Sequence, residues 1–241
     1  AHPDDSGIVY CSTRKKVDEL FEELSAAGVK AAKYKGDMST SQREKFQRQF
    51  INDDVAVMVA TNAFGMGIDK SNVRYVIHNN MPASIEAYYQ EAGRAGRDGE
   101  PAECMLLWSD NDIRIQRLLI DNSTAQAADV EGSAQAGQGK QRLLSSMISY
   151  CHTTGCLRKF ILSYFQDSAQ IPDKCGNCSN CQGTGSGIDV SKAAIAVMEC
   201  VKELRWSLGK SMIADIVCGS RNARVIEKNY DALNSYGSTK E

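Results

Sequence analysis

The sequence predicts an α/β fold, a parallel sheet with helices on both faces, followed by a helical segment with clustered cysteines and by a smaller last domain. Over residues 1–121, short apolar runs alternate with amphipathic helical patterns, which is the order that β-α-β crossovers produce. Three cysteines stand close together at 175–181, as in a metal-binding loop. Stretches poor in large apolar residues at 122–139 and 183–187 separate these parts, as linkers do.

Five short apolar runs predict the strands of the sheet. The runs at 55–59 and 73–77 are almost continuously apolar, as expected of strands that are covered on both faces. In the first helical pattern, Val17, Leu20 and Leu24 share one face. The predicted strands span 7–11, 29–34, 55–60, 73–78 and 102–108, and the predicted helices span 15–27, 41–50, 84–93 and a segment from about 110.

Composition divides the chain into four parts. We expect a first domain at 1–121, a flexible linker at 122–139, a cysteine-bearing subdomain at 140–182 and a partial domain at 188–241. The last part has few apolar anchors and therefore a marginal core, so we expect this domain to be cut short. Helical patterns in the later parts span 140–150, 156–165, 190–204 and 210–217, and an irregular polar tail follows.

Composition also excludes several classes of protein. With 42% hydrophobic and 24% charged residues, the chain of 241 residues is not disordered as a whole. It has no apolar run of about 18 residues and no signal-peptide pattern, so we expect neither a membrane span nor secretion. The net charge of −2 gives no overall basic field, but residues 140–181 carry five basic and two acidic residues and are the better candidate for an anion-facing surface. Nine cysteines, an odd number, favour thiols or metal in a reducing compartment over disulfides.

Four cysteines form the pattern of a metal site. Cys175, Cys178 and Cys181 are spaced C-x2-C-x2-C in a loop of small residues, and Cys156 lies 19 residues upstream. Four thiolates suit tetrahedral zinc, and small residues between ligands allow the tight turns that bring them onto one ion. We therefore predict a structural zinc with Cys156, Cys175, Cys178 and Cys181 as its ligands.

The cluster also has other interpretations. Cys151 and His152 are alternative upstream ligands, but Cys151 falls on a different helical face from Cys156, so we choose Cys156. A redox-active thiol cluster and an iron–sulfur site are the alternatives to zinc, and the lack of a basic or histidine neighbour in the loop disfavours an activated thiol. We expect the remaining cysteines to be buried in strands and helices: Cys11, Cys104, Cys200 and Cys218.

A second pattern lies at residues 90–99, Gln-Glu-Ala-Gly-Arg-Ala-Gly-Arg-Asp-Gly. Arg94 and Arg97 stand three apart, so a helical turn would direct both guanidinium groups to one face as a phosphate clamp. Arginine can stabilise the charge of a transferring phosphoryl group, and the flanking glycines would allow close approach. Upstream, Thr61 follows a buried strand and is expected at the carboxyl edge of the sheet, where ligands bind in open α/β folds. For either pattern alone, a surface salt-bridge site is the other interpretation.

Together, these patterns resemble the RecQ family, a branch of the superfamily 2 DNA helicases. The matching segments are 7–14 for helicase motif IV, 60–70 for motif V, 88–99 for motif VI, 156–181 for the RecQ zinc subdomain and 189–237 for the opening of the RecQ winged-helix domain. The resemblance implies that 1–121 is the second of two RecA-like motor domains and that 188–241 is a truncated winged helix.

The resemblance also implies roles for individual residues. It makes Arg97 the arginine finger to the ATP γ-phosphate, Arg94 a second phosphate contact and Gln90 a coupling residue. It places Gly67 and Asp69 toward the nucleotide. The implied contacts to the DNA backbone are Thr61, Arg14, Ser12 and Asn62.

Parts of the family pattern are absent or changed in these residues. No phosphate-binding loop or magnesium-holding acid is found, since Gly209-Lys210-Ser211 lacks the required earlier glycine. We therefore expect the first motor domain, with its ATP and Mg²⁺ sites, to lie upstream of Ala1, and the chain alone to hydrolyse no ATP. Where the family carries Tyr-His-Ala-Gly-Leu, this chain has Tyr-Lys-Gly-Asp-Met, so Lys35 is either a phosphate contact or a solvated loop lysine.

By this resemblance, the whole protein is an ATP-dependent helicase that moves 3′ to 5′ along single-stranded DNA in recombination, repair, replication and the SOS response. The implied partners are single-stranded, tailed or forked DNA, ATP, and repair and single-strand-binding proteins. A monomer is expected, in the cytoplasm near the nucleoid of a bacterium or in the nucleus of a eukaryote. The other function that we consider is a non-catalytic, zinc-stapled scaffold for DNA or a repair partner, which has no need of two glycine-flanked arginines. A thiol redox enzyme is a third interpretation and requires a cysteine of low pKa.

Overall fold

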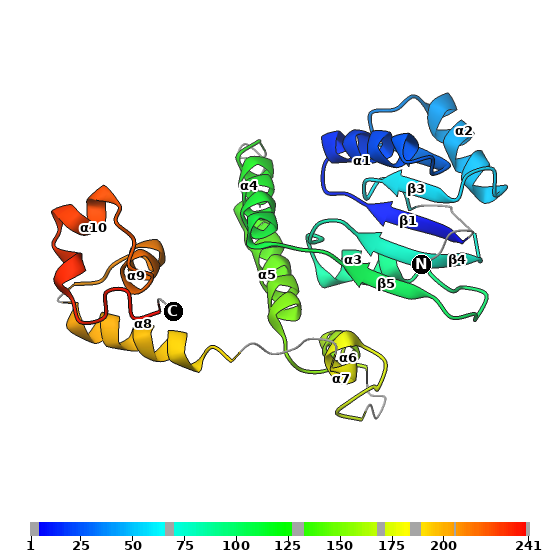
Figure 1. The fold of residues 1–241 in the computed structure, drawn as a ribbon. Helices are drawn as coiled ribbons and strands as arrows, with labels where there is room; N and C mark the ends of the chain where they lie inside the picture. The colour runs from blue at the N-terminus through cyan, green and yellow to red at the C-terminus, as the bar shows by residue number, and fades with distance from the viewer. Residues whose placement is uncertain are drawn as a thin grey trace. The chain divides into compact units, whose positions relative to one another are not determined.

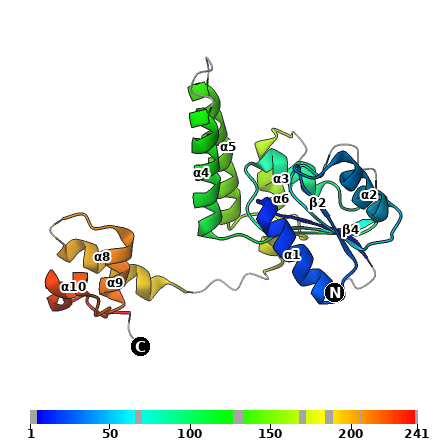
Figure 2. The same ribbon diagram turned by 90° about the horizontal axis from the view of Figure 1, so that it is seen from above.

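The structure is a computed structural model, and it describes residues 5–65, 70–126, 133–167, 172–183, 189–204 and 206–239. The chain forms two compact units, 1–182 and 183–241. Figure 1 labels their α-helices and most of their strands, and Figure 2 labels β2. The first unit contains the sheet and the cysteine-bearing helices. Among the described residues, no helix is both long and apolar enough to pass through a lipid bilayer.

A five-stranded parallel sheet with strand order β2-β3-β1-β4-β5 forms the base of the first unit (Figure 1). The predicted parallel α/β sheet is thereby confirmed. Tyr10 pairs with Ala60 on one side and with His78 on the other, so the central strands end level at the carboxyl edge. The strands are β1 (Ser6–Tyr10), β2 (Ala31–Tyr34), β3 (Val57–Ala60), β4 (Val73–His78) and β5 (Glu103–Leu106).

Helices cover both faces of the sheet (Figure 2). Because successive side chains of a strand point to opposite faces, β1 contributes to two separate clusters. Val9 packs in the cluster that includes Val17 of α1 (Arg14–Ala26), whereas Ile8 packs with Phe50 of α2 (Thr40–Ile51). Tyr88 of α3 (Ile85–Ala92) contacts the ring of His78 at the end of β4.

Side chains at the helix starts fix where these helices begin. Ser39 and Gln42 form a capping box at the start of α2, in which each side chain accepts a hydrogen bond from the backbone N–H of the other residue. Thr13 and Ser84 accept backbone N–H groups at the starts of α1 and α3. These caps place the helix starts directly after the sheet edge that β1, β2 and β4 reach.

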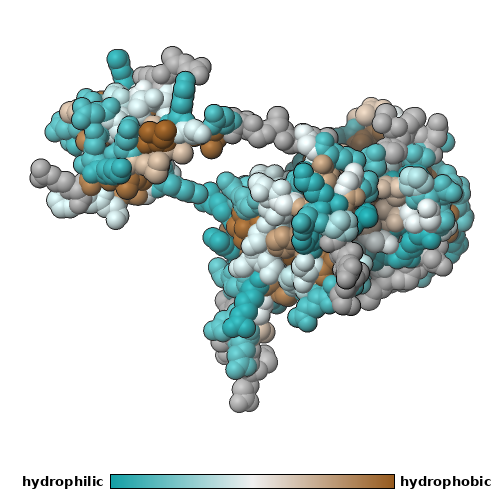
Figure 3. All heavy atoms as spheres, turned by 90° about the horizontal axis from the view of Figure 1, so that it is seen from below, coloured by the Kyte–Doolittle hydropathy of each residue, from teal (hydrophilic) through white to brown (hydrophobic). Residues whose placement is uncertain are grey.

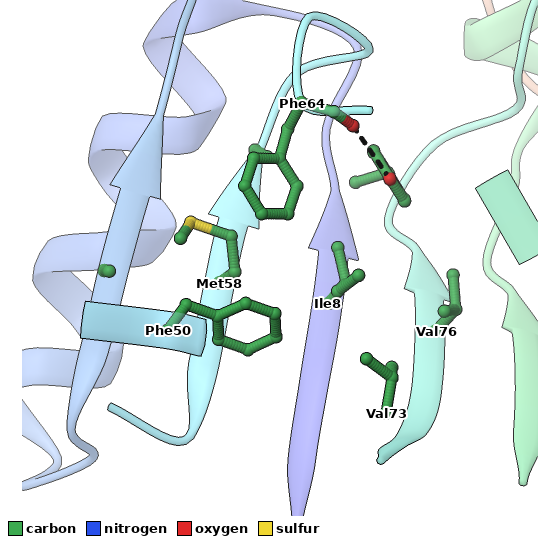
Figure 4. Packing of buried hydrophobic residues seen from close by; sticks show 9 residues of the cluster. Ile8, Phe50, Met58, Phe64, Val73 and Val76 are labelled. Atoms are coloured by element: carbon green, nitrogen blue, oxygen red, sulfur yellow. Dashed lines mark hydrogen bonds between the residues drawn. The ribbon is translucent and has the colours of Figure 1, made fainter. Parts of the chain in front are cut away.

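The core on the α2 side of the sheet is built from buried apolar side chains (Figure 4). Phe50, Phe64, Met58 and Ile8 are fully buried in it. The hydroxyl of Tyr10 donates a hydrogen bond to the backbone oxygen of Phe64, 3.0 Å away. This bond, drawn as the dashed line in Figure 4, ties the segment that follows β3 to the end of β1.

In the part of the chain that the structure describes, four helices follow the sheet in the first unit. In Figures 1 and 2, α4 and α5 lie side by side, and a third cluster joins them to α3 and α6. The helices are α4 (Asp110–Gln126), α5 (Ser133–His152), α6 (Leu157–Tyr164) and α7 (Ser179–Gln182).

The predicted flexible linker at 122–139 is wrong wherever the structure describes it. Residues 122–126 continue α4, and residues 133–139 open α5. Large apolar residues are scarce there, but alanine and glutamine are good helix formers, so the composition suits an exposed helix as well as a linker. Lys140 of α5 also donates to the Ser123 hydroxyl of α4 over 2.9 Å, which joins the two helices.

The second unit has a small core of its own, built from Ala196, Cys200, Ile216 and Val217. The tail predicted to be irregular is partly helical, because Asn222 caps a short helix and buries Val225. Apolar side chains also lie on the surface of this unit (Figure 3), and Val190, Ile195, Met198, Val201 and Trp206 are among those exposed. The helices are α8 (Ser191–Glu203), α9 (Lys210–Val217), α10 (Ala223–Glu227) and the 3-10 turn η1 (Tyr230–Ala232).

The expected burial of the remaining cysteines holds for two of the four. Cys11 and Cys200 are buried. Cys104 and Cys218 are exposed, so that expectation is wrong for them. Cys104 lies on β5, which is an edge strand, and Cys218 is the C-cap of α9, and both places leave a side chain open to solvent.

Candidate functional site

The carboxyl edge of the sheet gathers the side chains expected to contact DNA. β1 ends at Tyr10 and β3 at Ala60, and these two residues are paired, so the segments that follow them start side by side. Thr61 is bonded to the end of β2 as well, since its N–H donates to Tyr34 O over 3.1 Å. The residues that follow β1 and β3 at this edge are Ser12, Arg14, Thr61 and Asn62.

These four residues differ in exposure. Asn62 is exposed, and the Arg14 side chain is 66% exposed, with Nη1 3.9 Å from Asp37 Oδ2. Thr61 is 8% exposed, and its hydroxyl accepts the N–H of Ala63 at 3.4 Å. Arg14 and Asn62 are therefore open to solvent at this edge, whereas Thr61 shapes the turn that leads from β3 to Asn62.

Lys35 is not a solvated loop lysine, and that interpretation is wrong. Its side chain is 13% exposed, and Nζ lies 2.6 Å from Asp18 Oδ2. Lys33 Nζ lies 2.7 Å from the other oxygen of the same carboxylate. Hydrogen bonds from Lys33 and Lys35 hold the pKa of Asp18 below its usual value. The pair of lysines and Asp18 thus forms a charged cluster beside Arg14.

The turn after α3 carries the two arginines of the glycine-flanked pattern. The prediction that they share a helical turn is wrong, because α3 ends at Ala92 and Gly93 is its C-cap. Gly96 then adopts a φ of +65°, in the left-handed region that favours glycine. Its N–H donates to Val73 O at 2.9 Å, which fixes the turn against the start of β4.

The two arginines of this turn differ in exposure. Arg97 is exposed, whereas Arg94 is 6% exposed. Arg94 Nη2 lies 2.6 Å from the point where a side chain on Gly65 would begin, so the guanidinium rests on the segment that follows β3. Arg94 Nε is buried and has no hydrogen-bond partner among the described residues.

Arg94 lies beside Tyr10, which belongs to a buried cluster with His78 and Glu91 that the sequence patterns did not reveal. Tyr10 stacks on His78 with ring centroids 5.3 Å apart, and His78 Nε2 lies 2.8 Å from Glu91 Oε2. Burial raises the pKa of Tyr10, and the neighbouring Arg94 guanidinium opposes that rise. An ionised Glu91 requires the proton of His78 on Nε2, so the carboxylate selects that tautomer. The cluster connects β1, β4 and α3 beneath the arginine turn.

Gln90 lies on α3 and is exposed, one turn before Arg94. The residues expected to face the nucleotide from the β3 side, Gly67 and Asp69, lie outside the described residues.

The four cysteines expected as zinc ligands come together. The Sγ atoms of Cys156, Cys175, Cys178 and Cys181 lie within 4.8 Å of one another, and those of Cys175 and Cys181 are 3.9 Å apart. Zinc–sulfur bonds of about 2.3 Å in a tetrahedron place neighbouring sulfurs about 3.8 Å apart. The cluster therefore has the size and the ligand chemistry that zinc requires.

Backbone groups support the ionised form of two of these thiols. Desolvation opposes ionisation of Cys178, but hydrogen bonds, led by that from the Leu157 backbone, lower its pKa to about 6. Hydrogen bonds also lower the pKa of Cys156, against the effect of desolvation. One of them comes from the N–H of Lys159, which donates to Cys156 Sγ over 3.4 Å at the start of α6. Desolvation, with the neighbouring thiols, raises the pKa of Cys181 to about 11. Ionising all four together calls for a cation.

The alternative upstream ligands are engaged elsewhere. The His152 ring meets Trp108 edge to face, with centroids 4.7 Å apart. Cys151 packs against the cluster formed by α3, α4 and α5, and burial raises its pKa to about 12. Neither residue belongs to the sulfur cluster found among the described residues.

Three domain families match successive parts of the chain. The helicase conserved C-terminal domain matches residues 1–99, the RecQ zinc-binding domain residues 110–182 and the RQC domain residues 185–241. The chain is 44% identical over 236 residues to ATP-dependent DNA helicase RecQ of Bacillus subtilis (strain 168), a match that covers 98% of this chain and 38% of that protein. This chain belongs to the RecQ helicase family. It spans well under half the length of the RecQ relatives that it matches.

Two further similarities are to a eukaryotic relative and to a solved structure. RecQ-like DNA helicase BLM of Xenopus laevis is 37% identical over 247 residues, which covers 93% of this chain and 18% of that protein. A crystal structure of a DEAD box protein from Methanococcus jannaschii aligns with a TM-score of 0.42 and 30% identity, over 49% of this chain and 32% of that one. The RecQ zinc-binding match begins at Asp110, where α4 starts, and ends at Gln182, where α7 ends, so it includes residues 122–126 of α4 and 133–139 of α5.

Proposed function

We propose that this RecQ chain supplies the arginine-bearing half of the ATP site and part of the DNA track of an ATP-dependent DNA helicase that moves 3′ to 5′. One observation carries the proposal: Arg97 stands exposed on a turn bounded by Gly96 and Gly99, within the segment that matches the helicase C-terminal domain. An exposed arginine on a rigid turn can reach a phosphate on a facing domain. Arg97 is therefore the proposed arginine finger.

The other nucleotide contacts follow from the position of Arg97. Gln90, on the preceding helix, is the proposed coupling residue, and Gly67 and Asp69 are proposed to face the nucleotide. Arg94 rests on Gly65, so a phosphate reaches it only when the segment after β3 shifts. This order makes Arg97 the first phosphate contact and Arg94 the second.

The DNA track is proposed to run along the carboxyl edge of the sheet. Arg14 and Asn62 are exposed there, and Ser12 and Thr61 shape the two turns that carry them. Motors without sequence preference bind the backbone phosphates, and such contacts weaken as salt rises. Single-stranded and tailed or forked DNA are the proposed substrates.

The four-cysteine cluster is proposed to hold a structural zinc. Four thiolates complete a tetrahedron and leave no open position for substrate, so the ion would stabilise the fold and take no part in a reaction. The low pKa of Cys178 could also serve a redox thiol, but bound zinc would occupy that thiolate.

The chain by itself is proposed to hydrolyse no ATP, because its 241 residues contain no phosphate-binding loop to hold ATP and Mg²⁺. We expect no ATP hydrolysis above background by the purified chain, with or without single-stranded DNA, in a phosphate-release assay. The control is Arg97→Ala, which should give the same background. DNA-stimulated hydrolysis that Arg97→Ala abolishes would contradict this proposal.

The biological roles are proposed from the family alone. They are DNA recombination, repair and replication and the SOS response, with repair and single-strand-binding proteins as partners. The proposed protein acts as a monomer, at the nucleoid of a bacterium or in the nucleus of a eukaryote.

Binding of the chain to a 3′-tailed duplex, measured by fluorescence anisotropy across a salt series, tests the DNA track. Arg14→Ala should weaken binding and make the slope of log affinity against log salt shallower by about 0.7, the change expected for one lost single-strand phosphate contact. Arg48→Ala is the matched control, since Arg48 is exposed in the last turn of α2, which leads back to the opposite edge of the sheet. Equal effects of the two substitutions would overturn the proposed track.

A further inference from the structure

The cysteine cluster joins two separate parts of the chain. Cys175, Cys178 and Cys181 belong to one short loop, whose own turns bring them together. Cys156 precedes α6 and lies 19 residues before Cys175. Its place in the cluster therefore depends on contacts between the loop and the turn that leads into α6.

Asn180 makes such a contact with its side-chain amide. The Nδ2 atom donates to the backbone oxygen of Thr153 and to that of Gly155, each at 2.8 Å. Both oxygens lie in the turn that follows α5 and leads directly into Cys156. Asn180 itself stands one residue before Cys181 in α7. One amide group thus connects the turn before one ligand with the helix that carries another.

The chemistry of an amide suits this position. Its NH₂ group has two donors, and two carbonyl oxygens accept them. A carboxylate of the same shape has no donor and would place negative charge against the two carbonyls. Two further contacts cross this gap. The backbone of Leu157 donates a hydrogen bond to Cys178. Lys159 pairs with Asp173, but their side chains are 44% and 93% exposed, and exposed ion pairs contribute little.

We propose that Asn180 is the positioning residue that holds Cys156 in the zinc site. It does not touch the ion; it holds the turn 153–155 so that the Cys156 sulfur meets the other three. Groups that orient metal ligands in this way typically change metal affinity 10- to 100-fold when they are lost. The inference rests on the structural zinc proposed above.

Zinc affinity of the full chain, measured by competition with a chromophoric chelator, tests this role. Asn180→Asp should lower the affinity 10- to 100-fold, and Asn180→Ala should lower it in the same direction. Asn177→Asp is the matched control, because it adds the same charge to the same loop and keeps the backbone N–H that donates to Cys175 Sγ. The control should bind zinc within about twofold of the unchanged chain, which is less than the loss expected of an orienting group.

Measurements in a chain that already carries Cys156→Ser distinguish the positioning of Cys156 from a general loss of structure. If Asn180 acts through Cys156, then Asn180→Asp should change zinc affinity less than twofold in a chain that already carries Cys156→Ser. The absorption of the cobalt-loaded chain gives an independent readout, since Asn180→Asp should shift it from a four-thiolate toward a three-thiolate spectrum. Equal losses in both backgrounds, or a full four-thiolate spectrum with unchanged affinity, would overturn the assignment. Failure of the unchanged chain to bind zinc would instead overturn the proposed zinc site.

Discussion

Arg94 occupies space that Gly65 leaves open by having no side chain. An added Cβ on Gly65 would lie 2.6 Å from Arg94 Nη2, closer than such atoms approach. The guanidinium is nearly buried, and Tyr10 beside it donates to the oxygen of Phe64. The segment that follows β3 therefore contacts the turn that follows α3 at Gly65. A displacement of either segment would change the position of the Arg94 guanidinium.

A substitution at this glycine tests this contact. Gly65→Ala should displace the guanidinium and lower the free energy of unfolding by about 1 kcal/mol, the low end of the cost of overpacking, because the obstructing atom is the far end of a flexible side chain. In a chain that already carries Arg94→Ala, Gly65→Ala should lower the free energy of unfolding by only a few tenths of a kcal/mol, because the obstructing group is gone. Urea unfolding of the unchanged chain, of the two single variants and of the double variant gives both differences in the free energy of unfolding.

Gly36→Ala is the control for this prediction. There an added Cβ meets only the Cβ of Ala63 at 3.9 Å, an ordinary contact. Its free energy of unfolding should stay close to that of the unchanged chain. Equal costs of Gly65→Ala with and without Arg94 would show that the two residues do not compete for space.

At the scale of elements, α6 is fastened to α3. The hydroxyl of Tyr164 donates to Glu86 Oε1 over 2.6 Å, and Phe165 packs against Tyr89 with ring centroids 5.1 Å apart. α3 also precedes the arginine turn, so the cysteine-bearing part of the chain and the proposed ATP site share one helix. Loss of α6 would leave one side of α3 uncovered.

This fastening should depend on pH at the alkaline end. The hydrogen bond to Glu86 raises the pKa of Tyr164 to about 12, above the value of about 10 for an unfolded tyrosine. A raised pKa in the folded state means that the stabilisation is complete below about pH 10 and disappears as pH rises through 12. Tyr164→Phe should therefore cost about 1 kcal/mol at pH 8 and progressively less from pH 10 to 12.

Urea unfolding of both proteins across this range measures the effect, with Tyr230→Phe as a control in the other unit. A difference between the unchanged chain and Tyr164→Phe that stays constant up to pH 12 would rule out the bond to Glu86 as its source. The test compares the unchanged chain with Tyr164→Phe at each pH. Burial also raises the pKa of Tyr10 and of Tyr150, and this makes the stability of both proteins depend on pH in the same way.

The elements that the sequence predicts well are those with strong local patterns. Apolar runs predict all five strands, and the runs are clearest in β1 and β3, which are buried along their whole length. Cysteine spacing predicts the sulfur cluster, because three of its members lie within one turn-rich loop. The helix at residues 133–139 was not predicted, because an exposed Ala- and Gln-rich helix has the composition of a linker.

The parts that local patterns miss are contacts between distant segments. His78 meets Glu91, and Lys35 meets Asp18, only after β-α-β crossovers bring their elements together. The spacing of Arg94 and Arg97 predicted a helical turn, but Gly96 adopts a left-handed conformation that follows from its bond to Val73. These contacts and this turn conformation depend on how the sheet packs, and local sequence patterns do not specify that packing.

At the scale of the whole molecule, the two units have separate hydrophobic cores. Among the described residues, the first has three clusters on and beside the sheet, and the second has one small cluster around Ile216. Small domains bury a smaller fraction of their surface and are correspondingly marginal. The second unit should therefore unfold first and on its own.

Ile216→Ala tests this independence. Ile216 is fully buried, and its truncation should cost about 2–5 kcal/mol, enough to unfold a marginal unit. Hydrogen exchange read by mass spectrometry should then show unprotected amides in α8 and α9 and unchanged protection in β1 and β3. Ile8→Ala, equally buried in the first unit, is the reciprocal control. Loss of protection in both units after either substitution would mean that the chain unfolds as one body.

The N-cap of α6 has a consequence for the order of folding. Cys156 begins this helix, and its sulfur accepts the N–H of Lys159. A helix of eight residues is too short to start by itself in water, because its first turn must be ordered before most of its hydrogen bonds form. An ion that holds this sulfur also holds that first turn, and so supplies the nucleation step. The arrival of the metal, and not the intrinsic propensity of the segment, would then time the appearance of α6 during refolding.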